Sequence, residues 1–217
     1  MDWPLLDGIP EEPRRRVLAA GRLRRFARGE VIFHEDDPGD SLHLLAKGRV
    51  AVRVTTPLGE VATLAVLGPG NFFGELALLG PVASRTATVT ALEKTETISI
   101  HRDVFDDLKR EHPSVETFLT GVLGAQVRRL SDQVLEALFV PADKRVLRRL
   151  AELARTYGEG ASGTVIPLTQ EDLASVAGTS RATVNRVLGQ ATDAGIVEVS
   201  RGRISVVDPA TLEKRAR

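Results

Sequence analysis

The sequence predicts an α+β fold in three successive parts: an N-terminal antiparallel β-roll, a long central helix, and a C-terminal helix-turn-helix with a wing. Residues 23–100 form short apolar or alternating stretches separated by Gly, Pro and Asp, a long stretch of helical periodicity follows, and two amphipathic segments joined by a glycine come later. The 217 residues suffice for two domains with separate cores. We place the boundaries at 1–104, 105–140 and 141–217.

The composition excludes several classes of protein. With 42% hydrophobic and 27% charged residues the chain has an ordinary globular composition, and the absence of cysteine excludes disulfides, iron–sulfur clusters and thiolate nucleophiles. The four histidines are scattered without metal-ligand spacing, so we expect no metal, and no nucleophile–base pattern indicates an enzyme. Because no apolar run approaches the roughly 18 residues of a membrane span, we expect a cytoplasmic protein without membrane contact.

The charge is distributed unevenly although the formal net charge is zero. Residues 1–138 contain 17 Lys+Arg and 20 Asp+Glu, a net charge of −3, whereas residues 139–217 contain 12 and 9, a net charge of +3. A positive C-terminal part favours an anionic partner such as DNA for that part.

The N-terminal part begins with an expected helix and continues as strands. Residues Pro10 to Ala20 are typical of a short helix whose three consecutive arginines form a solvated face. Turn signals such as Asp37-Pro38-Gly39-Asp40 and Gly68-Pro69-Gly70 then separate short strands, as in an antiparallel roll or barrel. The expected strands are 30–33, 41–47, 50–55, 61–66, 87–91 and 96–100.

The stretch from Phe73 to Ala87, FGELALLGPVASRTA, has the residues of an anion and sugar site. Gly74 allows the backbone to approach a ligand closely, and the N–H groups at the start of the following helical turn favour a phosphate. Arg85 supplies a planar, positively charged guanidinium with paired N–H donors. Thr86 supplies a hydroxyl donor, and Glu75 supplies an acceptor for a sugar hydroxyl.

This string resembles the phosphate-binding cassette of the cyclic-nucleotide-binding domain, the sensory half of the CRP/FNR family of bacterial transcription factors. The resemblance implies that Gly74, Glu75, Leu76, Arg85 and Thr86 line the cyclic phosphate and ribose. It implies a cyclic nucleotide, with cyclic AMP the favoured effector.

The central part is expected to be a long helix that ends near Leu138. Its apolar or small residues follow heptad-like spacing, at Leu123, Val127, Leu130, Val134 and Ala137. Such a stripe is typical of a parallel coiled-coil seam, although a helix packed on its own domain has a similar pattern. The resemblance favours the seam, and therefore a homodimer. Pro141 should separate this helix from a second one over residues 143–156.

Residues 168–188, LTQEDLASVAGTSRATVNRVL, predict a helix-turn-helix. Thr169 and Asp172 can form a capping box, Gly178 permits the sharp turn, and Ser180 can cap the second helix. Buried positions fall at 184, 187 and 188, which leaves Arg181 and Arg186 pointing outward. Residues 196–207 predict a two-stranded wing around Arg201 and Arg203.

The second helix resembles the recognition helix of CRP-like regulators through S-R-x-T-V-x-R, and the resemblance extends over the full chain. It implies double-stranded DNA as a partner, with Arg181 and Arg186 able to read guanine by bidentate hydrogen bonds. Phosphate contacts are expected from Thr169, Gln170, Ser180, Thr183, Arg201 and Arg203. RNA polymerase is a further implied partner, because the equivalent of the loop of residues 157–163 touches it in relatives. The glycine-rich composition of this loop is equally typical of a flexible linker, so both interpretations stay open.

Two positions depart from the family pattern. Ala182 stands where the family usually has Glu, so a TGTGA-type half-site does not follow. Gln133 and Val134 stand where cyclic-AMP binders place Thr-Ser or Thr-Asn, and only Gln133 can hydrogen-bond a purine. Two alternatives therefore stay open: a constitutive or otherwise gated regulator of the same family, and a cyclic-nucleotide-binding regulatory protein that acts without DNA.

Overall fold

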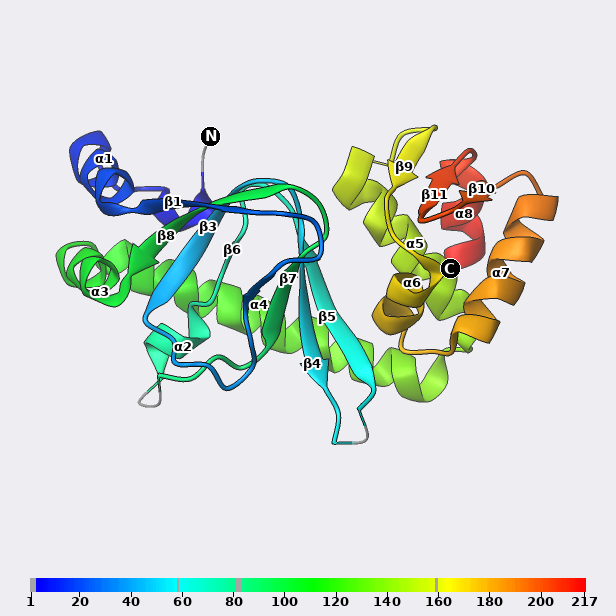
Figure 1. The fold of residues 1–217 in the computed structure, drawn as a ribbon, viewed down its shortest axis with the longest axis horizontal. Coiled ribbons are helices and arrows are strands. Elements are labelled where there is room, and N and C mark those ends of the chain that lie inside the picture. Colours follow the sequence, from blue (N-terminus) through cyan, green and yellow to red (C-terminus); the bar gives the residue numbers. More distant parts are fainter. Residues whose placement is uncertain (1–2, 58, 81–82, 159) are drawn as a thin grey trace. The chain divides into compact units, whose positions relative to one another are not determined.

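The computed structural model describes residues 3–57, 59–80, 83–158 and 160–217 (Figure 1). Its internal contacts divide the chain into two compact units, Met1–Val54 with Leu67–Leu130 and Thr55–Val66 with Ser131–Arg217. Across the described ranges, no helix is both long and apolar enough to cross a bilayer.

Two four-stranded sheets form the β-rich part of the fold, with the strand orders β1-β8-β3-β6 and β2-β7-β4-β5. The pairs β1·β8, β8·β3, β3·β6, β2·β7 and β7·β4 are antiparallel, as predicted. The strands are β1 (Arg22–Phe26), β2 (Val31–Phe33), β3 (Ser41–Lys47), β4 (Val50–Thr55), β5 (Val61–Leu67), β6 (Phe72–Phe73), β7 (Thr88–Ala91) and β8 (Thr95–His101).

Strands β3 and β4 have the predicted bounds, but β1 and β6 were not predicted. In β1 the side chains of residues 22–25 are all exposed, so no alternation marks it as a strand. Its pairing partner β8 defines it, from Arg22 opposite Ser99 to Phe26 opposite Thr95. Such pairing between distant segments leaves no local signal in the sequence.

The helices of the first unit cover the sheets and complete its core. They are the 3₁₀ turn η1 (Pro4–Leu6), α1 (Glu11–Ala20), α2 (Leu76–Leu79), α3 (Arg102–Glu111) and the beginning of α4 (Pro113–Phe139). Figure 1 shows α1 and α3 side by side, in agreement with their contacts. Buried side chains from η1, β3, α3 and α4, among them Leu5, Leu44, Phe105 and Leu119, share one apolar cluster.

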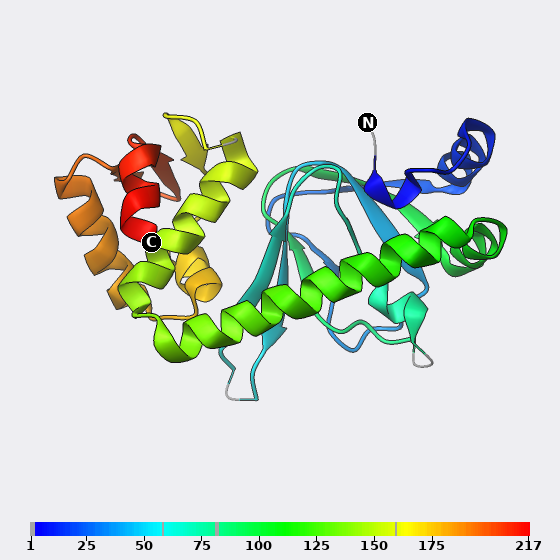
Figure 2. The same ribbon diagram turned by 180° about the vertical axis from the view of Figure 1, so that it is seen from behind.

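The expected long helical region is two helices, because His112 ends α3 and Pro113 begins α4. Proline has no N–H to donate to the preceding turn but fits the first turn of a new helix. Figure 2 shows α4 as one continuous helix. Pro141 separates it from the next helix, as predicted.

The second unit contains the predicted helix-turn-helix. Thr169 and Asp172 form the capping box, since Thr169 Oγ1 accepts from the Asp172 N–H at 3.1 Å and Asp172 Oδ2 accepts from the Thr169 N–H at 3.0 Å. Gly178 adopts the left-handed conformation at φ 58°. The helices are α5 (Ala142–Gly158), α6 (Gln170–Ala177), α7 (Arg181–Asp193) and α8 (Pro209–Ala216).

A small antiparallel sheet forms the wing, with the order β10-β11-β9. Strands β10 (Val197–Ser200) and β11 (Arg203–Val206) are the predicted pair. The third strand β9 (Thr164–Ile166) and the C-terminal helix α8 were not predicted. The wing is therefore larger than the two-stranded hairpin that the sequence indicates.

Candidate functional sites

The first candidate site surrounds α2 and Arg85 in the first unit. Gly74 has φ +86°, and a β-carbon there would lie 2.7 Å from Arg85 Nη1. A β-carbon at Gly39 would meet the Ala77 β-carbon at 2.3 Å and Arg85 Cδ at 3.2 Å. Both glycines allow backbone and guanidinium to approach closely, as a site for a small anion requires.

The Arg85 side chain is the central charge of this site, and the residue is only 4% exposed. Its Nη1 donates to Ser41 O at 2.6 Å and Gly74 O at 3.0 Å, and its Nη2 donates to Ser41 Oγ at 3.2 Å. The guanidinium carbon lies 4.2 Å from the centre of the Phe33 ring. The buried Nε has no hydrogen-bond partner among the described residues.

Burial sets the electrostatics of Arg85 and Glu75. Desolvation lowers the pKa of Arg85, although the carboxylates of Asp40, Asp37 and Glu75 oppose this. Desolvation likewise raises the pKa of Glu75, which is 8% exposed, against hydrogen bonding from its own backbone and the charge of Arg85. A buried cation with a free N–H beside a buried carboxyl can receive an anion that also carries a hydroxyl group.

The other predicted ligand residues lie in different places. Leu76 is half-buried and begins α2, and Thr86 is exposed next to Arg85. Pro81 and Val82, between the two halves of the cassette, lie outside the described residues. Gln133 is half-buried on α4 and belongs to the second unit, whereas the cassette belongs to the first.

Sequence reasoning missed Arg102, which holds the cassette helix in place. At the start of α3, its Nη2 donates to Ala77 O at 2.5 Å and Gly39 O at 3.3 Å, and its Nη1 donates to Leu78 O at 3.3 Å. These contacts satisfy carbonyls at the end of the four-residue helix α2, where a cation is also favoured by the helix dipole. An arginine 17 residues after Arg85 has no local signal for this role.

His43 is a second buried residue of this region. It is 5% exposed, its ring stacks on Phe73 with centroids 5.1 Å apart, and its Nδ1 lies 3.0 Å from Thr97 Oγ1. Burial, with the charges of Arg85 and Arg24, lowers its pKa to about 3. His43 is therefore neutral at physiological pH.

The second candidate site is the outer face of α7 and the neighbouring wing. The predicted outward residues are exposed, and the predicted inner residues Val184, Val187 and Leu188 are buried. Ser180 caps the helix, because its Oγ accepts from the Thr183 N–H at 3.2 Å. Arg201 and Arg203 are exposed in the wing, and Arg203 Nε donates to Ser200 Oγ at 2.7 Å. Thr169 and Gln170 lie at the start of α6.

The two arginines of α7 differ in their surroundings, which the sequence did not indicate. Arg186 makes a two-pronged ion pair with Asp143 in the first turn of α5, with Nη1 to Oδ2 at 2.8 Å and Nη2 to Oδ1 at 2.5 Å. Hydrogen bonding from Arg186 lowers the pKa of Asp143. Arg181, the first residue of α7, has no side-chain hydrogen bond or ion pair with any described residue.

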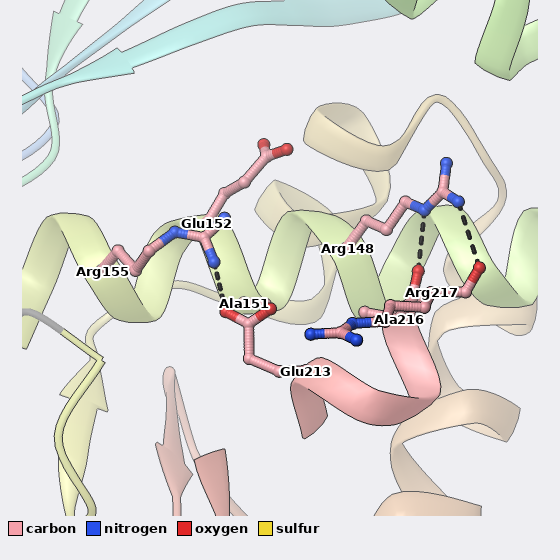
Figure 3. A pocket seen from close by; sticks show the side chains of 7 residues that line it. All are labelled: Arg148, Ala151, Glu152, Arg155, Glu213, Ala216 and Arg217. Atoms are coloured by element: carbon pink, nitrogen blue, oxygen red, sulfur yellow. Dashed lines mark hydrogen bonds and ion pairs between the residues drawn. The ribbon is translucent and has the colours of Figure 1, made fainter. Parts of the chain in front are cut away.

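A shallow pocket of about 180 Å³ lies between α5 and α8 (Figure 3). Arg148 donates through Nε to Ala216 O at 2.7 Å and through Nη2 to Arg217 O at 3.3 Å, and Arg155 pairs with Glu213. Arg148 and Arg155 on α5 therefore have hydrogen-bond partners at the C-terminal end of the chain. We interpret the pocket as part of the packing of α5 against α8, not as a ligand site. Within the described ranges, no group of three His, Cys, Asp or Glu could hold a metal ion.

Comparison with known proteins assigns a domain to each of the two regions that contain these sites. The profile of the cyclic nucleotide-binding domain matches residues 23–112, and that of the Crp-like helix-turn-helix domain matches residues 144–215. The first match contains the buried Arg85 site, and the second contains most of α5, the helix-turn-helix and the wing.

Similar proteins cover nearly the whole chain. A "Cyclic AMP receptor protein" of Thermus thermophilus is 35% identical over 214 residues, 98% of this chain and 96% of its own length. A "CRP-like cAMP-activated global transcriptional regulator" of Mycobacterium tuberculosis is 31% identical over 195 residues, 88% of this chain and 87% of its own. The solved c-di-GMP-responsive regulator CLP of Xanthomonas campestris has the same fold, with a TM-score of 0.78 at 20% identity over 91% of this chain and 99% of its own.

The matches include a full-length relative and both domain profiles, and the family is one of regulators, not enzymes. A cyclic nucleotide-binding domain stands first in the chain, and a DNA-binding helix-turn-helix stands last. The chain belongs to the CRP/FNR family of DNA-binding transcription regulators.

Proposed function

We propose that this regulator is a homodimer that binds specific DNA sequences under the control of a cyclic nucleotide, with cyclic AMP as the effector. The observation that carries the proposal is the buried Arg85 guanidinium, whose Nη1 donates to the Gly74 carbonyl and whose Nε has no partner among the described residues. The printed names of the relatives from Thermus thermophilus and Mycobacterium tuberculosis support cyclic AMP in particular. Acting on chromosomal DNA, the protein would work in the cytoplasm.

The ligand would engage the first site through its phosphate and ribose. Arg85 would face the cyclic phosphate, because an anion compensates a cation whose desolvation is otherwise unfavourable. Glu75 would accept a hydrogen bond from the ribose hydroxyl. Gly74, Leu76 and Thr86 would complete the wall of the pocket.

The base is recognised least directly. Gln133 can donate to or accept from a purine edge, whereas Val134 can do neither. Val134 is apolar and 58% exposed, and it offers no hydrogen bond to a base. A second candidate is therefore a regulator of the same family with another effector or none. Calorimetry distinguishes these possibilities.

The DNA site would combine base reading with backbone contacts. Arg181 and Arg186 would each read a guanine, and each good bidentate contact discriminates against a wrong base by about 1–3 kcal/mol. Phosphate contacts would come from Thr169, Gln170, Ser180, Thr183, Arg201 and Arg203. RNA polymerase would contact residues 157–163, of which Glu159 lies outside the described residues.

A homodimer is supported by apolar side chains along α4 that the single chain leaves exposed. Val127 is 63% exposed, Val134 58% and Leu138 68%. A dimer would place two recognition helices about 34 Å apart, one turn of DNA. The ligand would act by binding one arrangement of these helices more tightly, and a switch from 1% to 99% needs about 5.5 kcal/mol of differential binding.

Titration calorimetry with cyclic AMP and cyclic GMP tests the effector. We expect saturable binding of cyclic AMP to the wild type, and loss of most of this affinity in Arg85→Ala. Arg22→Ala removes an exposed arginine of the same unit and serves as the matched control, with unchanged binding. No heat with either nucleotide would contradict cyclic-nucleotide control while leaving DNA binding untouched.

Fluorescence anisotropy with DNA tests the second half of the function. An operator is selected from a random duplex library with the wild-type protein and cyclic AMP. We expect the double variant Arg181→Ala, Arg186→Ala to lose the preference for this operator over scrambled DNA, while sedimentation shows the same oligomer. Retained preference in the double variant would exclude α7 as the reading helix.

A further inference from the structure

The ion pair between Asp143 and Arg186 joins the recognition helix to the first turn of α5. Both side chains remain accessible, with exposed fractions of 53% for Arg186 and 43% for Asp143. Two hydrogen bonds, at 2.8 and 2.5 Å, fix the orientation of the guanidinium. An exposed ion pair contributes little to the stability of the fold. We therefore consider what the ion pair does for the orientation of Arg186.

The pairing leaves part of the guanidinium available. A guanidinium has five N–H donors, and Asp143 accepts one from each Nη. The Nε–H and the second N–H of each Nη remain available to donate to another acceptor. On the side edge of the group, the Nε–H and one Nη N–H are parallel, which is the pattern that guanine O6 and N7 accept. Arg186 can therefore bind Asp143 and a guanine at once.

We propose that Asp143 is a specificity-determining positioning residue, which holds the Arg186 guanidinium in one orientation so that its side edge reads a single guanine. The inference rests on the proposed DNA-binding function and refines it. The ion pair orders the long side chain of Arg186 before DNA arrives. Arg181 has no such partner among the residues that the structure describes, so it retains its rotamer freedom until it binds.

The same carboxylate has a second, opposite effect. Its negative charge lies beside a residue that approaches a polyanion, so it weakens binding to every sequence alike. Asp143 would thus lower overall affinity and raise selectivity at one base pair. This combination distinguishes a positioning role from a purely structural one. Replacing a residue with a purely structural role would weaken binding at all sequences.

The experiment uses the full-length protein with cyclic AMP, the selected operator and a set of operators in which each guanine is replaced singly by adenine. The guanine read by Arg186 is the one whose replacement no longer matters in Arg186→Ala. For wild type we expect this replacement to lower affinity about tenfold or more. In Asp143→Asn the loss should fall below about threefold, with losses at the other guanines unchanged and affinity for scrambled DNA increased.

Two variants control the interpretation. Glu171→Gln removes one exposed negative charge of the same domain without touching Arg186, and should raise affinity for scrambled DNA while keeping full discrimination. Asp143→Glu keeps a carboxylate and should restore part of the discrimination. Full discrimination in Asp143→Asn, or a uniform loss at every guanine, would overturn the role of Asp143. Failure of the wild type to select any operator would instead overturn the proposed function, and this inference with it.

Discussion

Arg85 shows how one residue can serve both the fold and the ligand. Its Nη groups donate to Ser41 and Gly74, which ties strand β3 to the start of the cassette, while its Nε finds no partner in the part of the chain that the structure describes. Alanine at this position would leave the part-buried carbonyls of Ser41 and Gly74 without this donor, at a cost of about 1–3 kcal/mol. Loss of ligand binding in Arg85→Ala must therefore be compared with its thermal stability.

His43 predicts a pH dependence of stability. Its folded pKa of about 3 lies below the ordinary histidine pKa of 6.5, so the unfolded chain binds the proton between these values and the folded protein does not. Its contribution is present above pH 6.5 and is lost as the pH falls towards 3, by up to about 1.4 kcal/mol per pH unit. Urea unfolding at pH 7, 6, 5 and 4 measures this loss.

The variant His43→Phe isolates the contribution, because it keeps an aromatic ring beside Phe73 and removes the titrating group. We expect the free energy of unfolding to decline less steeply with falling pH in the variant than in the wild type. Glu75 has a raised pKa and acts in the opposite direction, but it is present in both proteins and cancels in the difference. Equal slopes in the two proteins would contradict the burial of a neutral His43.

At the scale of the element, α2 is too short to be stable alone. A helix of four residues has almost no internal hydrogen bonds, so tertiary contacts must hold it. Arg102 provides two of these contacts, to Ala77 O and Leu78 O, and also donates to Gly39 O. The position of α2 therefore depends on α3, which begins more than 20 residues after α2 ends.

Arg102→Ala should destabilise the protein by about 1–3 kcal/mol, because partly buried carbonyls lose their donor. We also expect weaker binding of cyclic AMP, since Gly74 and Glu75 precede α2 directly. Chemical denaturation and calorimetry measure the two effects, again with Arg22→Ala as the matched control. Unchanged stability and affinity would show that α2 keeps its place without Arg102.

At the scale of the whole molecule, the exposed apolar stripe on α4 requires a partner surface. Val127 and Val134 occupy two positions of the predicted heptad-like seam, and Leu138 lies one residue beyond its last position. Together these three side chains leave much apolar area in water. A second copy of the same helix would bury this stripe symmetrically.

The double variant Val127→Glu, Val134→Glu should shift the protein from dimer to monomer in sedimentation equilibrium, because like charges would face each other across the seam. We expect affinity for a two-half-site operator to fall steeply, while binding to a single half-site changes little. Arg128→Glu, one residue from Val127 and outside the heptad stripe, controls for added negative charge on α4. A variant that stays dimeric would place the interface elsewhere.

Local patterns in the chain were sufficient for the elements whose signals are local. The capping box at Thr169, the glycine turn at Gly178 and the apolar stretch within Ser41–Lys47 each predicted an element that the structure contains. The cassette string likewise indicated the region of the buried Arg85. These features depend on neighbouring residues, which any fold of this sequence would keep close together.

Other features exist only because distant segments meet. Strand β1 has no alternation and is a strand because it pairs with β8, and β9 joins the wing by pairing with β11. The carbonyl partners of Arg85, the cap that Arg102 forms on α2, and the pairing of Arg186 with Asp143 join residues 11 to 44 positions apart. Hydrogen-bond partners at such separations depend on packing of the whole domain, and packing leaves no periodic signal in the sequence.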